Sequence, residues 1–207
     1  MKFNKPKINN CINKDLLECI NNNEFNNGIF NKNIDNIKIS SLTFDSCIFD
    51  NIDFNNIELE NIDLVDVIFK SCDLSNKNFN KQFLVRVVFD DCKLVGTTFI
   101  ESNIKDVEFN NCNSKYTNFS GGIINNLIIN KSDFSLSTFN ETKIKNLILN
   151  EVKLNKTEFI KTKLKDIDFS SCDINKIIFD TNSLEGIIID SFQSINIVGL
   201  LGVKIKK

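Results

Sequence analysis

Large apolar residues recur at every fifth position from residue 34 to residue 189 of this 207-residue chain. Of these 32 central positions, 31 are Phe, Leu or Ile, and Ser114 is the one exception. Helices repeat every ~3.6 residues and strands every two, so neither element sustains a period of five. A chain with this pattern must turn a corner in each repeat, so that every central residue points toward a common axis.

Small or β-branched residues occupy a second register, two positions before each central residue. The residue between the two registers is often Asp or Asn, which favour turns because their side chains hydrogen-bond nearby backbone groups. We therefore expect two inward-facing side chains per repeat. The second register includes Cys47, Val67, Cys72, Val87, Cys92, Thr97, Cys112, Thr117, Ser137, Thr157 and Cys172. Because buried Cys behaves as a small hydrophobe, we interpret its thiols as packing groups rather than as metal or redox sites.

The number of sides follows from two longer periods. Between residues 69 and 119, Phe alternates with Leu, Ile or Ser at successive central positions, which requires an even number of sides per coil. Cys72, Cys92 and Cys112 recur at every fourth repeat, which indicates four sides. The sequence thus predicts a square coil and about eight coils in all. At the ~4.8 Å spacing of strands, they would form a rod of roughly 40 Å.

The two ends depart from the repeat and divide the chain into three predicted segments. Residues 1–33 are expected to form an N-terminal cap and an irregular first coil, because Phe25 and Phe30 lie one residue out of phase with Ile34. Within them, residues 15–20 fit either a short capping helix or part of that coil. Residues 34–190 are the solenoid. Residues 191–207 are apolar without the five-residue period, which fits either a cap on the last coil or a surface that pairs with a second subunit.

Composition excludes several classes of function. The chain has no His, so a His-based catalytic triad or metal site is absent, and we identify no Gly-rich phosphate loop. A formal net charge of −2 gives no indication of a nucleic-acid or membrane-surface binder. No stretch approaches the ~20 apolar residues that span a bilayer. Seven Cys cannot all pair, which favours the reducing cytoplasm. We expect a protein that is not an enzyme and needs no cofactor or metal.

The repeat resembles the pentapeptide-repeat family, whose consensus is A(D/N)LXX with a central Leu or Phe, over about three quarters of the chain. The resemblance implies an all-β fold, a right-handed quadrilateral β-helix with a short C-terminal apolar helix or cap. Residues 69–75, Phe-Lys-Ser-Cys-Asp-Leu-Ser, look like a stretch of the Qnr quinolone-resistance proteins. The end is similar too, with Leu184-Glu-Gly-Ile, Ser191-Phe-Gln-Ser and Leu200-Leu-Gly-Val.

The Qnr resemblance implies a rod-shaped homodimer that imitates a DNA duplex, binds DNA gyrase or topoisomerase IV and protects it from quinolones. Dimerisation would use the C-terminus. The residues expected there are Phe192, Ile195, Val198, Leu200 and Leu201. Many Qnr proteins carry inserted loops that touch the topoisomerase, but the register here is unbroken from residue 34 to residue 189. In this respect the chain is closer to the loop-free mycobacterial gyrase inhibitor, and a loop mechanism is not expected.

The distribution of charge supports DNA mimicry only in the N-terminal half of the solenoid. Residues 31–110 hold 14 acids and 8 bases, whereas residues 111–190 hold 10 of each. The candidate partner-binding acids are Asp45, Asp50, Asp53, Asp63, Asp66, Asp73, Asp90, Asp91, Asp106 and Glu108. Each of them also fits an ordinary turn or solubility residue.

A second function remains open, a protein-interaction scaffold unrelated to topoisomerases. It would use a stripe of β-branched residues that we expect to face outward along one side, although such residues are also simply favoured in strands. The stripe contains Ile48, Ile68, Val88, Ile128, Ile148 and Ile188, and Glu108 and Asp168 interrupt it.

Overall fold

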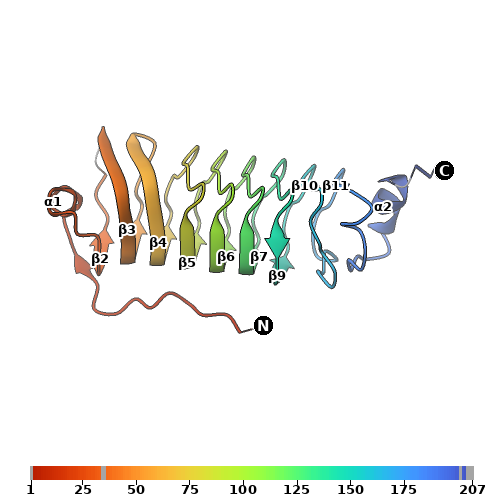
Figure 1. Cartoon of the computed structure of the whole chain (residues 1–207), viewed down its shortest axis with the longest axis horizontal. Helices are drawn as coiled ribbons and strands as arrows, with labels where there is room; N and C mark the ends of the chain where they lie inside the picture. The colour runs from red at the N-terminus through yellow and green to blue at the C-terminus, as the bar shows by residue number, and fades with distance from the viewer. Residues whose placement is uncertain (1, 34–35, 201, 204–207) are drawn as a thin grey trace.

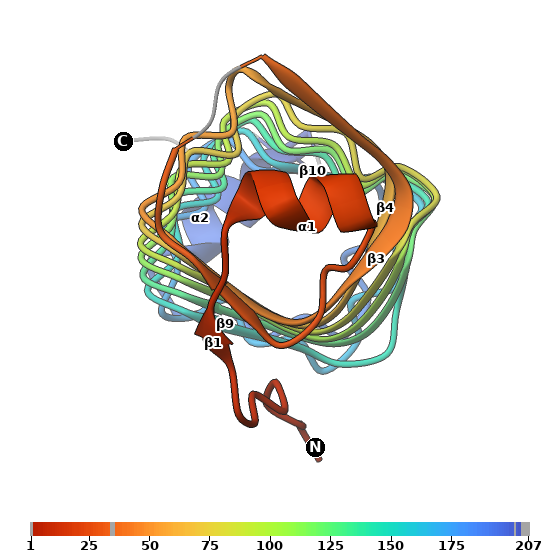
Figure 2. The same cartoon turned by 90° about the vertical axis from the view of Figure 1, so that its left-hand side faces the viewer.

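The computed structural model, which describes residues 2–33, 36–200 and 202–203, is a parallel β-solenoid of about eight coils (Figure 1). Seen along its axis, the coils superimpose as a four-cornered outline (Figure 2). The predicted fold class is therefore confirmed. One sheet of nine strands has the order β1-β2-β3-β4-β5-β6-β7-β8, with β9 also paired to β7, and a second sheet joins β10 to β11.

Most elements are short, as expected for a chain that turns every five residues, but β3 and β4 each continue for 14 residues. The strands are β1 Ile12–Asn13, β2 Gly28–Phe30, β3 Ile37–Asp50, β4 Ile57–Lys70, β5 Phe83–Asp90, β6 Asn103–Asn110, β7 Ile123–Asn130, β8 Lys143–Ile144, β9 Leu147–Asn150, β10 Glu158–Phe159 and β11 Ile178–Phe179. The helices are α1 Leu16–Asn22 and α2 Ser194–Leu200. Neither is long and apolar enough to cross a membrane.

Strand register confirms the coil length that the cysteine spacing predicted. From β3 to β7 each residue pairs with the equivalent residue four repeats later, as in Phe69 with Phe89 and Phe89 with Phe109. The first coil is one residue shorter, because Phe30 pairs with Phe49. The phase slip seen in the sequence is therefore a shortened coil, and Phe30 keeps its place in the core.

The core is a set of stacked side chains along the axis. Every central Phe from Phe44 to Phe169 is fully buried. Rings one coil apart stack, with centroids 5.1 Å apart for Phe69 and Phe89 and 4.7 Å apart for Phe99 and Phe119. Rings on opposite sides of the coil meet edge to face, as Phe89 and Phe99 do. Each coil covers the aromatic layer of the next, so most of the stability arises between nearest neighbours.

The Asp and Asn residues between the two inward registers form the expected turns. Asp73 Oδ1 accepts a hydrogen bond from the amide of Ser75 at 3.0 Å, and Asp53 does the same for Asn55 at 2.8 Å. Most corner residues, two positions after a central residue, adopt left-handed backbone, for example Asp91 with φ of 54°. Polar residues tolerate this conformation best, because their side chains can bond locally.

The two helices lie at opposite ends of the rod (Figure 1). Asp15 caps α1 by accepting a hydrogen bond from the amide of Glu18, and α1 crosses the open end of the first coil (Figure 2). Leu16 is buried there. At the other end, Gln193 Nε2 donates to the carbonyls of Phe169 and Cys172, at 2.8 Å each. Of the two readings of residues 15–20, the structure shows the capping helix.

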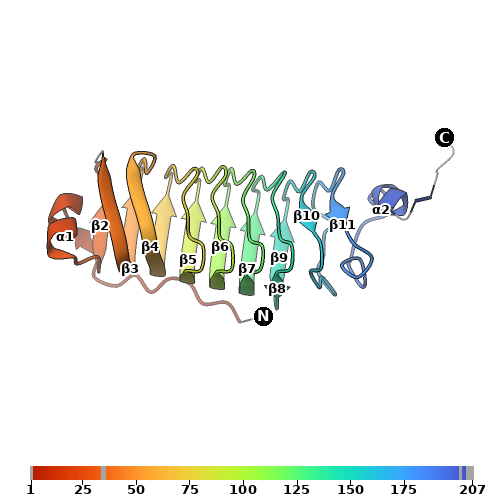
Figure 3. The same ribbon diagram turned by 45° about the horizontal axis from the view of Figure 1, so that its top comes forward.

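An extended segment, residues 2–10, runs from the α1 end back along the outside of the solenoid (Figures 1 and 3). We call it the N-terminal arm. Its contacts advance from coil to coil, since the Lys7 amide donates to Asp66 and Lys2 O accepts from Asn126 Nδ2. The arm thus covers one corner of the rod over several coils.

Candidate functional site

Five of the predicted acids gather at one corner of three successive coils, which we call the acidic corner. Asp50 and Asp90 lie on the same ladder, two coils apart, and Asp53 pairs directly with Asp73. Asp91 accepts a hydrogen bond from Ser71 Oγ, one coil below, at 3.4 Å. The acidic corner comprises Asp50, Asp53, Asp73, Asp90 and Asp91. Carboxylates on successive coils are spaced by about 4.8 Å along the axis, so the corner presents an ordered acidic array.

Lysines interrupt this array, and the sequence analysis did not identify them. Lys70 lies between Asp50 and Asp90 on their ladder. Lys93 Nζ lies 2.9 Å from Asp73 Oδ2. Desolvation alone would raise the pKa of Asp73, but hydrogen bonds from Lys93 and Ser75 lower it to about 2. The sequence carries a signal for this arrangement, because these aspartates and lysines follow one another at intervals of four repeats. Reading the charges at that interval would have shown that acids and bases share each ladder.

Three other candidate acids lie apart from the acidic corner. Asp45 and Asp63 belong to the parallel pair β3 and β4, on another side of the coil. Asp63 Oδ1 accepts from the amide of Phe83 at 2.8 Å, so it serves the next coil as a structural acceptor. Glu108 interrupts the β-branched stripe, opposite Val88 and Ile128. The ten acids therefore do not form one surface.

Asp66 and Asp106 are not surface residues, which corrects the sequence-based assignment. Asp66 is 5% exposed and Asp106 is 1% exposed, because the N-terminal arm covers both. Asp66 forms a bidentate pair with Arg86, at 2.5 and 2.6 Å. Desolvation would raise the pKa of Asp66, but the hydrogen bonds from Arg86 and from the Lys7 amide keep it below its ordinary value.

Beyond Asp66 and Arg86, the corner under the N-terminal arm is lined by Asp106 and by amide side chains. Asp106 accepts from Asn4 Nδ2 at 2.8 Å and from Asn126 Nδ2 at 2.5 Å. Asn126 in turn accepts from Asn146 Nδ2 at 2.6 Å. The corner under the arm is therefore a hydrogen-bonded polar column that fixes the arm to the rod.

The C-terminal segment presents apolar side chains at the end of the rod. Phe192 is 85% exposed, and Ile195 and Leu200 are also exposed, whereas Val198 is half-buried. Leu201, the fifth residue expected at a dimer contact, lies outside the described residues. An exposed cluster of this kind is unusual on a monomer and is typical of an interaction surface.

Comparison with known families supports the repeat. Two overlapping matches to the pentapeptide repeat region model cover residues 37–117 and 62–135. The register of four repeats per coil and the buried central residues extend the same pattern beyond these matches. This chain contains a pentapeptide repeat region. No curated protein sequence matches it.

Several solved structures resemble this chain with its pentapeptide repeat region. A trypsin-treated form of QnrB1, a plasmid-mediated fluoroquinolone resistance protein, is 16% identical with a TM-score of 0.47, over 84% of this chain and 99% of that one. HetL, a pentapeptide-repeat protein involved in heterocyst differentiation regulation from Nostoc sp. strain PCC 7120, is 14% identical with a TM-score of 0.32, over 87% and 98%. Likenesses this weak say nothing about what this chain binds.

The cysteine column of the pentapeptide repeat region lies in the core, as predicted. Cys72, Cys92 and Cys112 are buried, and their thiols donate to the carbonyls of Phe49, Phe69 and Phe89 at 3.4 Å. Burial raises the pKa of Cys47, in the same inward register, to about 12. Among the described residues, no group of three or more acids and cysteines is placed to hold a metal ion.

The β-branched stripe follows the ladder that the sequence predicted. Ile48, Ile68 and Val88 pair in succession, and Ile128 pairs with Ile148. Most of these side chains are half-buried, while Ile148 and Ile188 are exposed. The stripe is thus a shallow apolar surface that becomes more exposed toward the C-terminal end.

Proposed function

We propose that this protein is a non-catalytic DNA mimic of the cytoplasm, which binds a type II topoisomerase, DNA gyrase or topoisomerase IV, and protects it from quinolones. The acidic corner is the observation that carries this proposal. An ordered array of carboxylates on a narrow rod is the charge pattern that a basic DNA-binding groove attracts. A duplex carries one charge per ~1.7 Å, far more than this rod, so binding must depend on the local cluster.

The C-terminal end supports the second part of the proposal, a homodimer. Phe192, Ile195 and Leu200 project from the last coil, and two copies joined there would bury them. End-to-end pairing would also lengthen the rod, so that a longer stretch of a DNA-binding groove could be occupied. A cap that serves only its own last coil would leave these side chains in water.

The experiment is a supercoiling assay with DNA gyrase, with and without a quinolone, at micromolar concentrations of the full-length protein. We expect protection that weakens as salt rises from about 50 to 200 mM, because the contacts are electrostatic. The double variant Asp90→Asn with Asp91→Asn should protect less. Glu151→Gln is the matched control, because Glu151 occupies the same left-handed corner position as Asp91, three coils away.

Two results would contradict the proposal. The first is no effect of the wild-type protein on supercoiling, DNA cleavage or quinolone sensitivity. The second is equal protection by the corner variant and the wild-type protein at every salt concentration. The assay should be repeated with topoisomerase IV, since the proposed surface does not distinguish the two enzymes.

The exposed part of the β-branched stripe favours a second candidate function, a scaffold for an unrelated protein. Ile148 and Ile188 are exposed apolar side chains on a flat side of the rod. In this case the double variant Ile128→Lys with Ile148→Lys would abolish capture of a specific partner, whereas the acidic-corner variant would not. A captured topoisomerase that is lost only with the acidic-corner variant would exclude the scaffold.

A further inference from the structure

The nine-stranded sheet ends in the middle of the rod. β8 and β9 both pair with β7, and within the described residues no ladder pair joins either strand to the following coil. The other sides continue, since Lys153 pairs with Asp173 and Glu158 pairs with Ile178. The coils are therefore closed on two sides and open on the sides of β8 and β9.

The opening leaves backbone groups without partners. In the two preceding coils, the Ile123 amide donates to Ser102 O and the Lys143 amide to Gly122 O, both at 2.9 Å. The equivalent bonds, from the Lys163 amide to Thr142 O and onward along the coil, are not formed between these described residues. An uncovered strand edge of this kind is a template for an added extended chain.

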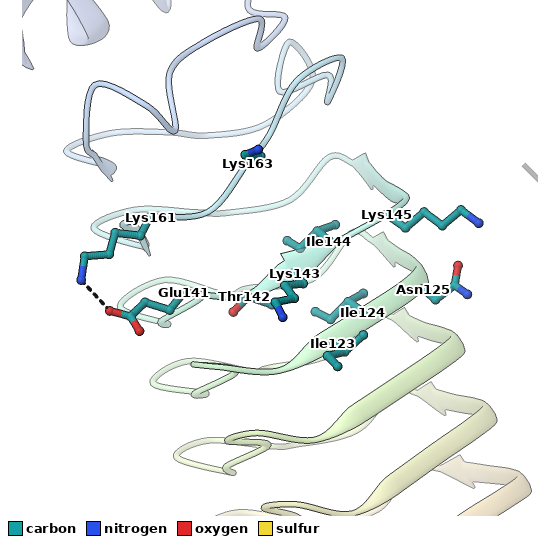
Figure 4. Close-up of a pocket in the computed structure, with 10 residues that line it drawn as sticks. All are labelled: Ile123, Ile124, Asn125, Glu141, Thr142, Lys143, Ile144, Lys145, Lys161 and Lys163. Carbon is teal, nitrogen blue, oxygen red and sulfur yellow. Dashed lines mark hydrogen bonds and ion pairs between the residues drawn. The ribbon is translucent and has the colours of Figure 1, made fainter.

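A cavity of about 850 Å³ occupies the opening, a volume within the range of ligand-binding sites. Figure 4 shows the ribbon that carries Lys163 diverging from β8 above Ile123 and Ile144. Ile123, on the floor, is 49% exposed. On the neighbouring strand β9, Leu147 is 6% exposed, whereas Leu127, one coil below, is 0% exposed.

The walls of the cavity are basic. They carry Lys143, Lys145, Lys161 and Lys163, against one acid, Glu141, whose Oε1 lies 2.8 Å from Lys161 Nζ (Figure 4). A second hollow of about 450 Å³ lies along the other side of residues 161–165 and adds Lys165. Residues 161–165 therefore lie between two poorly filled spaces. Lys143 and Lys145 recur four repeats later as Lys163 and Lys165, which was the sequence signal for their convergence.

We propose that this opening binds an extended acidic segment of a partner protein, which adds as a strand between β8 and residues 161–165. Its backbone would satisfy the carbonyl of Thr142 and the amide of Lys163. Carboxylates on its outward face would meet Lys143 and Lys163, and apolar side chains on its inward face would cover Ile144, which lines the cavity. A small phosphate would use only the charges and leave the isoleucines and the strand edge uncovered. The site is independent of the proposed topoisomerase contact, which uses acids in the other half of the rod.

The probe is a fluorescein-labelled octapeptide of alternating glutamate and valine with blocked termini, titrated into the full-length protein and followed by fluorescence anisotropy. We expect saturable binding, together with slower hydrogen exchange of the Lys163 and Lys165 amides. The same peptide with lysine in place of glutamate should not bind. The acidic peptide N-methylated at alternate residues should bind on the order of tenfold more weakly, because it cannot complete the backbone ladder.

The double variant Lys143→Glu with Lys163→Glu should weaken binding of the acidic peptide by on the order of tenfold or more. Lys156→Glu is the matched control, because Lys156 is an exposed lysine outside the cavity, and it should leave binding unchanged. Thermal unfolding checks that both variants fold. Three results would overturn the proposal: no peptide binding by the wild-type protein, equal binding of the N-methylated peptide, or binding of inorganic tripolyphosphate at these lysines without the peptide.

Discussion

Phe134 fills the space that Ser114 leaves one coil below. Both occupy the same column of central positions, and the Ser114 amide donates to Asp133 O at 2.8 Å, so the ladder is continuous there. The Phe134 ring meets Phe109 edge to face with centroids 5.3 Å apart, and reaches Phe119 at 6.3 Å. Ser114, the one polar central residue, is thus part of a small-to-large pair in an unbroken ladder. Its buried Oγ has no hydrogen-bond partner among the described residues.

This pair predicts compensation between two substitutions. Ser114→Leu alone should lower the free energy of unfolding by about 1–3 kcal/mol, because the added side chain collides with Phe134. Phe134→Leu alone should lower it by about 1–2 kcal/mol, because it leaves a cavity. The double variant restores the Leu that occupies this column at Leu94 and Leu154, and should recover most of the loss. Urea unfolding of all four proteins gives the coupling energy, and simple additivity would show that the two side chains do not share space.

The buried pair of Asp66 and Arg86 predicts a second coupling. Arg86→Asn alone should cost about 3 kcal/mol, because it leaves the Asp66 carboxylate buried without its charge partner. Asp66→Asn with Arg86→Asn should be much more stable than the single variant, because two amides can repeat the contact of Asn126 with Asn146. Asn also suits the left-handed backbone of both positions. Chemical denaturation measures the difference, and a double variant no better than Arg86→Asn would contradict the assignment.

Asp73 predicts an acid-dependent contribution to stability. Its pKa falls from 3.8 to about 2 in the folded protein, so the folded state binds a proton less readily than the unfolded chain. The contribution is therefore complete above pH 3.8 and is lost as the pH falls toward 2. Asp73→Asn should reduce stability at pH 7 and flatten the pH dependence in this window. Thermal unfolding at pH 7, 4 and 2.5 tests it, with Asp50→Asn as an exposed control on the same corner.

The exposed C-terminal apolar cluster predicts self-association. Phe192→Ser with Ile195→Ser should convert a dimer into a monomer, because the proposed contact loses its two most exposed apolar side chains. Sedimentation equilibrium distinguishes the two states. The thermal unfolding of the coils should change little, since Gln193, which bonds the last coil, is kept. A monomeric wild-type protein at tens of micromolar would refute the proposed dimer.

The sequence by itself determined the coil. Its five-residue period placed Phe69, Phe89 and Phe109 on one inward column, and the cysteine spacing set four repeats per turn of the solenoid, because each repeat makes the same local turn wherever it stands. Local chemistry also placed the Asp turns, whereas the structure decided that the segment after Asp15 is a capping helix.

Only the tertiary structure decided which charges reach the surface. Asp66 and Asp106 occupy the same repeat position as Asp91 in the sequence, yet the arm buries them, and that contact joins residues 59 and 102 positions apart. The opening beside β8 was equally hidden, since residues 161–165 keep the central Leu164 of the repeat. Whether two neighbouring coils form backbone hydrogen bonds on a given side depends on how one whole coil packs on the next. The pattern within a single five-residue repeat does not determine that packing.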